Sequence, residues 1–426
     1  MVLTKNGYRA RLVDRNISLT LETMGAVCIE GPKWCGKTWT GLNHSESVID
    51  LSDSKNDFAN KKLAEVDVYE ALNGARPRMI DEWQDVPKVW DAVRTTVSSD
   101  SLKGAFVLTG SSTPVRKGIM HSGAGRIATV RMRTMSLFES GDSSGAVSVS
   151  DLFESKMKTR TIDDVTLRKL IYLTLRGGWP QSIGVDIDKV TILSRNYLQS
   201  IRDEDFVKID GKKRDAERVR RVITSLGRNE STVVSNRTIL RDIEEYDDDK
   251  MDPDTVADYL GILDRMFLTE YQNAFNPGLR SSYRVGKSPK RHLTDPSLSA
   301  ASMNASVDGL LNDLNTYGFL FEGMCERDLA VYAATHGGTV KHYRDSAGNE
   351  MDAVVELGDG RWGAFEIKLG MNQVDEASEK LLNLSERFRS SSRRPPSFLC
   401  VLVGMSSYAY QREDGVYVVP ITALGP

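Results

Sequence analysis

The sequence predicts an α/β protein of several domains, and three observations lead to that class. The chain has 426 residues, enough for about three domains. Short apolar runs at residues 25–30, 48–51, 78–80 and 104–108 alternate with helical patterns, which indicates a parallel sheet covered by helices on both faces. After residue 300, strand patterns lie between two further helical patterns, which indicates a second α/β domain.

Composition limits the class of protein. Hydrophobic residues make up 40% and charged residues 27% of the chain, as in ordinary globular proteins. The net charge of −3 gives no overall basic field, so contact with nucleic acid would need a local basic patch. No run approaches the ~20 apolar residues of a membrane span, and the first residues lack a signal-peptide core. We therefore expect a soluble, cytoplasmic protein with no membrane partner. The scattered cysteines predict neither a zinc site nor a disulfide framework: Cys28, Cys35, Cys325 and Cys400.

The first apolar run leads into a phosphate-binding loop. Residues 31–38 read GPKWCGKT, which satisfies GxxxxGK[ST] between a strand and a helix. Backbone N–H groups of such a loop surround the β-phosphate, the lysine neutralises β/γ oxygens, and the hydroxyl holds Mg²⁺. The predicted ATP-binding residues are those of the loop and the next position: Gly31, Pro32, Lys33, Trp34, Cys35, Gly36, Lys37, Thr38 and Trp39.

Acidic residues follow the third predicted strand of this part, at residues 78–80. In MIDEWQ, Asp81 and Glu82 come directly after apolar residues, at the distance expected of a Walker B strand. We expect Asp81 to support Mg²⁺ through water and Glu82 to act as general base on the attacking water. An isolated Asp-Glu pair would more often be a solvated turn, but here it follows a phosphate-binding loop.

Three weaker candidates complete this first site. Thr109 and Ser111 end the following apolar strand, where their hydroxyls can bind the γ-phosphate or the attacking water, although hydroxyls also cap ordinary strands. Arg126 follows Gly125 and is a candidate for stabilising transition-state charge in a neighbouring subunit. A surface salt bridge is the alternative for Arg126.

The middle of the chain predicts helices and then a basic hairpin. Three candidate helices at residues 216–226, 237–245 and 254–265 precede a strand-like region at 266–294, an order that fits a winged helix-turn-helix. Basic residues in both parts are candidates for phosphate contacts with DNA, while nearby acidic residues favour a structural joint instead. The basic candidates, with one tyrosine among them, are Lys212, Lys213, Arg214, Arg218, Arg220 and Arg221 in the first part, and Arg280, Tyr283, Arg284, Lys287, Lys290 and Arg291 in the second.

A second constellation lies near the C-terminus. Asp352 in NEMDAVVEL and Glu366-Ile-Lys368 in AFEIKLG are separated by a Gly-Asp-Gly turn, which is the PD-(D/E)xK arrangement. Strand alternation places Glu366 and Lys368 on one face beside Asp352 of the paired strand. Two carboxylates can then hold Mg²⁺ or Mn²⁺ while the lysine activates water, and Glu322 on the preceding helix can complete the metal shell. An amphipathic hairpin that only meets solvent is the alternative.

These motifs, with LTGSS, GRI and Gly177-Gly178-Trp179-Pro180 in the same order, resemble the AAA-type P-loop ATPases of bacteria and archaea that carry a C-terminal domain of unknown function. The resemblance covers nearly the whole chain and implies a restriction-endonuclease-like fold for its C-terminal part. The chain departs from the usual loop in having bulky Trp34 and Cys35 before Gly36.

The resulting prediction has four parts. They are a P-loop ATPase core (1–140), a helical lid (141–210), a winged helix-turn-helix (211–295) and a restriction-endonuclease-like domain (296–426). The leading hypothesis is an ATP- and Mg²⁺-dependent ATPase that acts on DNA, with a second metal site near the C-terminus. The alternative is a nucleotide-dependent switch whose nuclease-like domain binds a partner without cutting. DNA binding, DNA cleavage and assembly into a homo-oligomer stay open at this stage.

Overall fold

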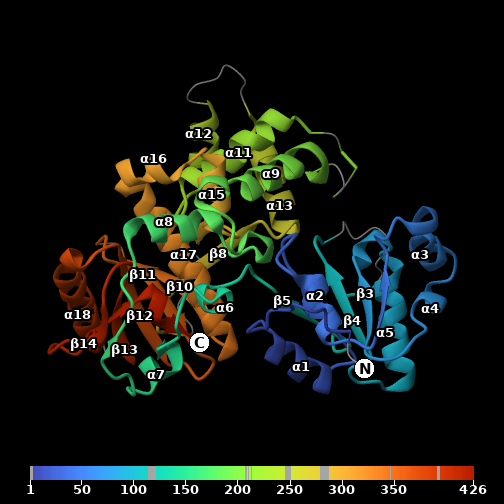
Figure 1. Cartoon of the computed structure of the whole chain (residues 1–426), viewed down its shortest axis with the longest axis horizontal. Helices are drawn as coiled ribbons and strands as arrows, with labels where there is room; N and C mark the ends of the chain where they lie inside the picture. The colour runs from blue at the N-terminus through green and yellow to red at the C-terminus, as the bar shows by residue number, and fades with distance from the viewer. Residues whose placement is uncertain are drawn as a thin grey trace.

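The computed structural model describes residues 3–113, 121–206, 209, 211–212, 214–244, 251–278, 287–345, 347–390 and 394–426. Figure 1 shows an N-terminal sheet with its helices on the right, a group of helices at the top, and a C-terminal sheet with its helices on the left. The predicted α/β class with a parallel sheet is confirmed.

The N-terminal sheet has five parallel strands in the order β2-β3-β4-β1-β5. They are β1 (Ala26–Glu30), β2 (Ser47–Asp50), β3 (Arg78–Asp81), β4 (Phe106–Gly110) and β5 (Ile127–Arg131). Its helices are α1 (Asp14–Thr23), α2 (Lys37–Asn43), α3 (Lys55–Val66), α4 (Val68–Ala71) and α5 (Lys88–Asp100).

Alternate residues of β1 enter two different cores, because successive side chains of a strand point to opposite faces. Ala26 and Cys28 pack into the core that also holds Trp90. Val27 and Ile29 pack into the core on the α1 side. The sheet is thus covered on both faces, and its internal strand β1 leads directly into the phosphate-binding loop.

Helices dominate the next part. They are α6 (Leu137–Ser140), α7 (Val149–Phe153), α8 (Leu167–Arg176), α9 (Ile192–Ser200), α11 (Ala216–Arg228), α12 (Asn236–Glu244), α13 (Pro253–Arg265) and α15 (Pro296–Ser302). Aspartates accept hydrogen bonds from the first turns of α11, α13 and α15, and prolines stand at the first positions of the last two. The three helices expected between 216 and 265 are present within two residues of the predicted bounds. The hairpin of β8 (Thr269–Ala274) and β9 (Lys290–Leu293) follows them and pairs antiparallel.

The C-terminal sheet has nine strands in the order β7-β14-β15-β13-β12-β11-β10-β8-β9. Its central elements follow one another as α17 (Leu314–Thr335), β10 (Thr339–Arg344), β11 (Glu350–Glu356), β12 (Trp362–Lys368), α18 (Val374–Ser390) and β13 (Phe398–Val403). This part also contains β14 (Tyr408–Gln411), β15 (Tyr417–Pro420) and α16 (Val307–Asn312). α17 packs on one face of this sheet and α18 on the other.

Two segments on either side of α7 pair with the end of the chain. β6 (Val147–Ser148) pairs with β16 (Leu424–Gly425), and β7 (Arg160–Thr161) pairs with β14. Part of the stretch expected to form the lid therefore packs with the C-terminal sheet. In the same way, β8 pairs parallel with β10, so the hairpin that ends the middle part is also an edge of the C-terminal sheet. Within the described ranges, no helix is long and apolar enough to cross a bilayer.

Candidate functional site

The phosphate-binding loop requires its two glycines. A Cβ on Gly31 would lie 2.2 Å from the carbonyl oxygen of Met132, so only glycine fits there. Gly36 has a φ of 105°, a conformation that glycine adopts without strain. Lys37 begins α2 and is buried, and its Nζ donates a hydrogen bond to the Pro32 carbonyl over 2.8 Å. A lysine and a helix N-terminus thus meet at one point, as an anion site requires.

The unusual side chains of the loop pack against the helical middle part. The Trp34 ring lies 4.8 Å from the Tyr197 ring of α9, and Lys33 Nζ lies 2.6 Å from Asp205 Oδ1. Cys35 is fully buried, with its Sγ near the Met132 carbonyl. These contacts leave the glycines in place while joining the loop to α9 and the turn that follows it.

Trp39 lies near Lys5 and is exposed. Its side chain is 40% exposed, and Lys5 Nζ lies 5.3 Å from its ring centroid. It stands in the first turn of α2, next to Thr38.

Asp81 and the loop hydroxyl come together at the carboxyl ends of β3 and β1. Asp81 Oδ1 accepts hydrogen bonds from Thr38 Oγ1 at 3.3 Å and from the Thr109 hydroxyl. Burial raises the pKa of Asp81 to about 6, although the hydrogen bonds from Thr109 and Thr38 favour its charged form. A hydroxyl and a buried carboxylate are oxygen ligands of the kind that Mg²⁺ prefers. These residues fit a magnesium ion beside the phosphate loop.

Glu82 lies next to the hydroxyl that ends the neighbouring strand. It has a φ of 52°, and its side chain accepts a hydrogen bond from Ser111 Oγ at 2.8 Å and another from Gln84 Nε2. Its backbone N–H donates to Thr109 Oγ1. The structure therefore brings Lys37, Thr38, Asp81, Glu82, Thr109 and Ser111 to one edge of the sheet.

Arg126 lies at the opposite edge of the same sheet. It precedes β5, and its carbonyl accepts from the backbone N–H of Ala26 at the start of β1, whereas the phosphate loop follows the end of β1. Its guanidinium donates to Ser98 Oγ over 2.9 Å. Arg126 therefore does not belong to the nucleotide site of its own chain.

The C-terminal motif also comes together. Lys368 Nζ lies 2.9 Å from Glu366 Oε1 and 3.4 Å from Asp352 Oδ2, and the Ile367 N–H donates to Asp352 Oδ2 over 2.8 Å. Glu366 is 1% exposed, and burial together with the Asp352 charge raises its pKa. A second lysine, Lys380 of α18, lies 2.6 Å from Glu366 Oε1.

Glu322 lies against Lys290, which the sequence predicts to lie on a DNA-binding hairpin. Lys290 of β9, predicted to belong to a DNA-binding wing, is buried, and its Nζ lies against Glu322 Oε1 and 2.9 Å from Glu326 Oε1. The prediction that Lys290 faces DNA is wrong, because its ammonium forms ion pairs inside the protein. Burial raises the pKa of Glu322, and the charge of the Lys290 ammonium opposes this shift.

The positions of these C-terminal residues leave no room for a metal ion beside the lysines. Lysine ammonium groups contact Glu322, Glu326, Glu366 and Asp352. In the part of the chain that the structure describes, no group of three or more His, Cys, Asp or Glu residues is arranged to hold a metal ion. As placed, Glu322, Asp352 and Glu366 do not fit a second metal ion.

The basic residues proposed for DNA contact are largely paired or buried. Arg214 pairs with Asp258, Arg220 and Arg221 pair with Glu217, and Arg291 donates to Asn236. Lys213, Arg280, Tyr283 and Arg284 lie outside the described residues. The described residues therefore give little support to a basic surface.

Sequence reasoning missed three residues of these sites. Glu326 lies four residues after Glu322, and this helical spacing could have indicated it. Gln84, which donates to Glu82, and Lys380 carry no pattern that separates them from ordinary surface residues.

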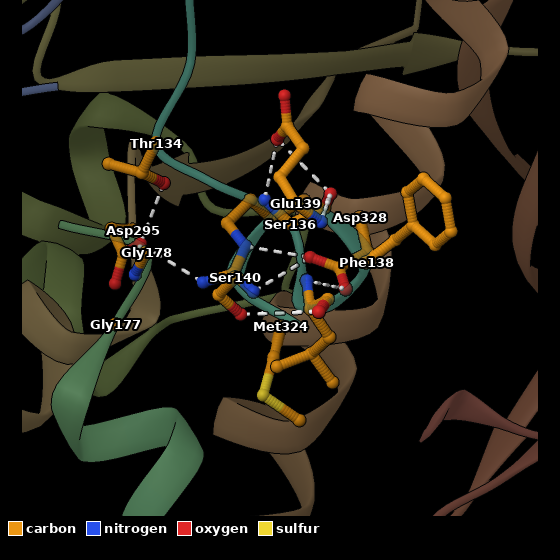
Figure 2. A network of polar contacts seen from close by, with 12 residues as sticks. Thr134, Ser136, Phe138, Glu139, Ser140, Gly177, Gly178, Asp295, Met324 and Asp328 are labelled. Carbon is orange, nitrogen blue, oxygen red and sulfur yellow. Dashed lines mark hydrogen bonds and ion pairs between the residues drawn. The ribbon is translucent and has the colours of Figure 1, made fainter. Parts of the chain in front are cut away.

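A buried polar network joins the N-terminal and C-terminal parts (Figure 2). Asp295 Oδ2 accepts from Thr134 Oγ1 at 2.7 Å and from the Gly178 N–H at 2.9 Å, and it pairs with Arg327 of α17. Asp328 accepts from the Leu137 N–H at the start of α6. The segment that leaves β5 is thereby fixed to α17 and to the Gly177-Gly178-Trp179-Pro180 motif.

Three family models match separate parts of the chain. Residues 23–140 match a family described as an AAA domain, and residues 167–308 and 317–424 match two domains of unknown function. Uncharacterized proteins of Mycobacterium bovis and Mycobacterium tuberculosis are each 24% identical over 346 residues, which is 80% of this chain and 70% of theirs.

Among solved structures, a Walker-type ATPase of Pyrococcus abyssi is 13% identical with a TM-score of 0.43, covering 71% of this chain and 97% of its own. The replication initiator DnaA, bound to AMPPCP and single-stranded DNA, is 13% identical with a TM-score of 0.28, covering 62% and 91%. These TM-scores are low, so the assignment depends on the family match and on the geometry of the loop. The N-terminal part of this chain is thus similar to an AAA domain over residues 23–140 and carries a P-loop.

Proposed function

We propose that the chain hydrolyses ATP at the edge of the N-terminal sheet. The observation that carries the proposal is the contact of Thr38 with Asp81, since it joins the phosphate loop to the acidic strand end in one site. The AAA family match over residues 23–140 supports the same activity.

Each residue of the site has a distinct part in this reaction. Lys37 leaves the Pro32 carbonyl and binds the β/γ-phosphate oxygens, while Thr38 and Asp81 hold Mg²⁺, which neutralises charge on the phosphates. Glu82 orients the attacking water and accepts its proton. Ser111 and Thr109 position the two carboxylates through their hydroxyls.

Steady-state hydrolysis and nucleotide binding test this proposal. We expect Lys37→Ala to lose ATP binding, and Glu82→Gln to keep binding while kcat falls by roughly 10²–10⁴, the usual contribution of a general base. Glu22→Gln, an exposed change on α1, is the matched control and should be unaffected. Equal turnover of Glu82→Gln and wild type would remove Glu82 as the base, and unchanged ATP affinity of Lys37→Ala would reject the phosphate loop.

For the rest of the chain we propose a nucleotide-dependent switch, with DNA as the candidate partner. The order α17, β10, β11, β12, α18, β13, with Asp352, Glu366 and Lys368 on adjacent strands, favours the predicted nuclease-like fold. Helices α11–α13 followed by the β8–β9 hairpin favour the predicted winged helix. Binding without cutting is favoured over cleavage, because ammonium groups already contact the carboxylates.

A cleavage assay separates the two alternatives. Single- and double-stranded DNA would be incubated with Mg²⁺ or Mn²⁺, with and without ATP, beside Lys368→Ala. We expect no cleavage by wild type. Cleavage that disappears in Lys368→Ala would establish a nuclease and reject the switch without cleavage, whatever the ATPase result.

A further inference from the structure

Lys290 lies where two parts of the chain meet. Its side chain is 11% exposed, and its Nζ contacts Glu322 Oε1, Glu326 Oε1 at 2.9 Å and the carbonyl oxygen of Asp352 at 2.9 Å. The lysine belongs to β9, whereas its partners belong to α17 and β11. The ammonium is thus enclosed by oxygen atoms of the C-terminal α/β part.

The oxygen atoms around this ammonium are of the kind that binds a divalent cation. Glu322 and Glu326 are four residues apart on α17, so their carboxylates share one face of the helix. The pairing of β10 with β11 shifts register between Lys341 and Tyr343, and the Asp352 carbonyl accepts from side chains instead. Carboxylate and carbonyl oxygens are hard ligands suited to Mg²⁺ and Mn²⁺.

Other contacts of the hairpin hold Lys290 in this position. The next inward residue of β9, His292, places Nδ1 2.8 Å from Glu230 Oε1 and Nε2 3.4 Å from Glu326 Oε2. Between them, the Arg291 N–H donates to the Thr232 carbonyl. These contacts hold the backbone of Lys290 in place beside α17.

Lysine ammonium groups also contact the carboxylate of Glu366. Glu366 Oε1 contacts Lys368 at 2.9 Å and Lys380 at 2.6 Å. Glu366 Oε2 is buried and has no hydrogen-bond partner among the described residues. Lysines thus supply positive charge at both ends of the motif.

We propose that the ammonium of Lys290 occupies the cation position of a C-terminal carboxylate site, formed by Glu322, Glu326 and the Asp352 carbonyl, in place of a divalent metal. The C-terminal α/β part is held to the β8–β9 hairpin by this cation, and its carboxylates take Mn²⁺ or Mg²⁺ only when the lysine charge is removed. The inference deepens the proposed switch without cleavage, and it does not depend on ATP hydrolysis.

Mn²⁺ binding to the full-length protein tests the proposal. The free Mn²⁺ signal in electron paramagnetic resonance would be titrated without nucleotide, in an Asp81→Asn background that lacks the carboxylate of the ATPase site. We expect no binding by Asp81→Asn up to about 1 mM Mn²⁺. Asp81→Asn/Lys290→Gln should gain a Mn²⁺ site, and addition of Glu322→Gln should remove it.

Thermal unfolding gives a second readout. Because Lys290→Gln leaves buried carboxylates without their counter-charge, we expect its Tm to fall by roughly 5–15 °C and to recover partly with Mn²⁺. Lys341→Gln is the matched control, since Lys341 pairs with Glu356 on the neighbouring strands outside the carboxylate site. It should gain neither Mn²⁺ binding nor a Mn²⁺-dependent Tm.

Two outcomes would overturn the proposal. In the first, the Asp81→Asn variant binds Mn²⁺ although Lys290 is present, and this binding is lost when Glu322→Gln is added. In the second, a folded Lys290→Gln variant gains no Mn²⁺. If Lys290→Gln does not fold without metal, recovery of its folded state on addition of Mn²⁺ supports the proposal, and failure of Mn²⁺ to restore it overturns the proposal. A negative result in these Mn²⁺ experiments would not affect the proposal that the chain hydrolyses ATP. Likewise, absence of ATP hydrolysis would not affect the proposal for Lys290.

Discussion

At the scale of single residues, Gly178 shows how closely the parts of this chain approach each other. Its N–H donates to Asp295, and its carbonyl accepts from the Met135 N–H over 2.7 Å. A Cβ at this position would lie 2.1 Å from the Met135 carbonyl oxygen and 2.6 Å from the Met135 nitrogen. Backbone atoms cannot rotate away as a side chain can, so the strand-to-helix segment would have to move.

Gly178→Ala is therefore expected to destabilise the protein by about 3 kcal/mol, as in overpacked cores. Gly261→Ala is the control, because it is the same substitution at a position inside α13. No atom lies within 4 Å of the Cβ that it would add. That change should stabilise by about 0.5–1 kcal/mol through helix propensity. Chemical denaturation measures both; equal stabilities would contradict the close contact at Gly178.

The residues of the two sites differ in how far the sequence predicts them. Lys37, Thr38, Asp81 and Glu82 were predictable because a local motif and the common edge of a parallel sheet fix their positions. Lys290 was not, because its partners lie 32, 36 and 62 residues away and its neighbours in sequence resemble those of a surface hairpin. Only the folded arrangement distinguishes a buried lysine from an exposed one.

At the scale of elements, the β8–β9 hairpin contacts both the end of β5 and the C-terminal carboxylates. Glu270 on β8 pairs with Arg131 at 2.9 Å and with Arg133 at 3.0 Å, at the end of β5 beside the phosphate loop. Glu270 is the register partner of His292 on β9, two residues from Lys290. The order of helices and hairpin was predictable from capping residues and periodicity, whereas the pairing of β8 with β10 depends on long-range contacts that the local sequence does not encode.

Glu270 should make stability depend on acid pH. Burial alone would raise its pKa, but Arg133 and Arg131 lower it from 4.5 to about 2. A lowered folded-state pKa gives stability that is present above pH 4.5 and is lost as pH falls towards 2. The advantage of wild type over Glu270→Gln should be about 3 kcal/mol near pH 6 and should shrink by about 2 kcal/mol at pH 3.

Denaturation of both proteins between pH 6 and 3 measures this difference. Glu217→Gln is the control, since the Glu217 pKa is also lowered to about 2 by Arg220, but its side chain is 49% exposed. Solvent screening should leave that pair with little effect on stability. A pH-independent difference between wild type and Glu270→Gln would show that the arginines do not stabilise the charged carboxylate.

At the scale of the whole molecule, functional candidates lie at both ends of the strands of the N-terminal sheet. Its carboxyl edge holds the phosphate loop, Asp81 and Glu82, and the β8–β9 hairpin and α9 approach this edge from the rest of the chain. Its amino edge holds Arg126, which is exposed. Any arginine contribution from Arg126 must therefore reach the nucleotide of another copy.

This geometry predicts a complementation pattern. If Arg126 acts on a neighbour, Arg126→Ala should lower kcat by roughly 10³ or more without loss of ATP binding. Arg126→Ala mixed with Glu82→Gln should regain measurable turnover, because some interfaces then combine an intact Glu82 with an intact Arg126 from the other copy. Arg94→Ala on α5, which pairs with Asp91, is the matched surface control. Full activity of Arg126→Ala would assign it to the surface hydrogen bond with Ser98, and inactivity of the mixture would place both residues' effects within one chain.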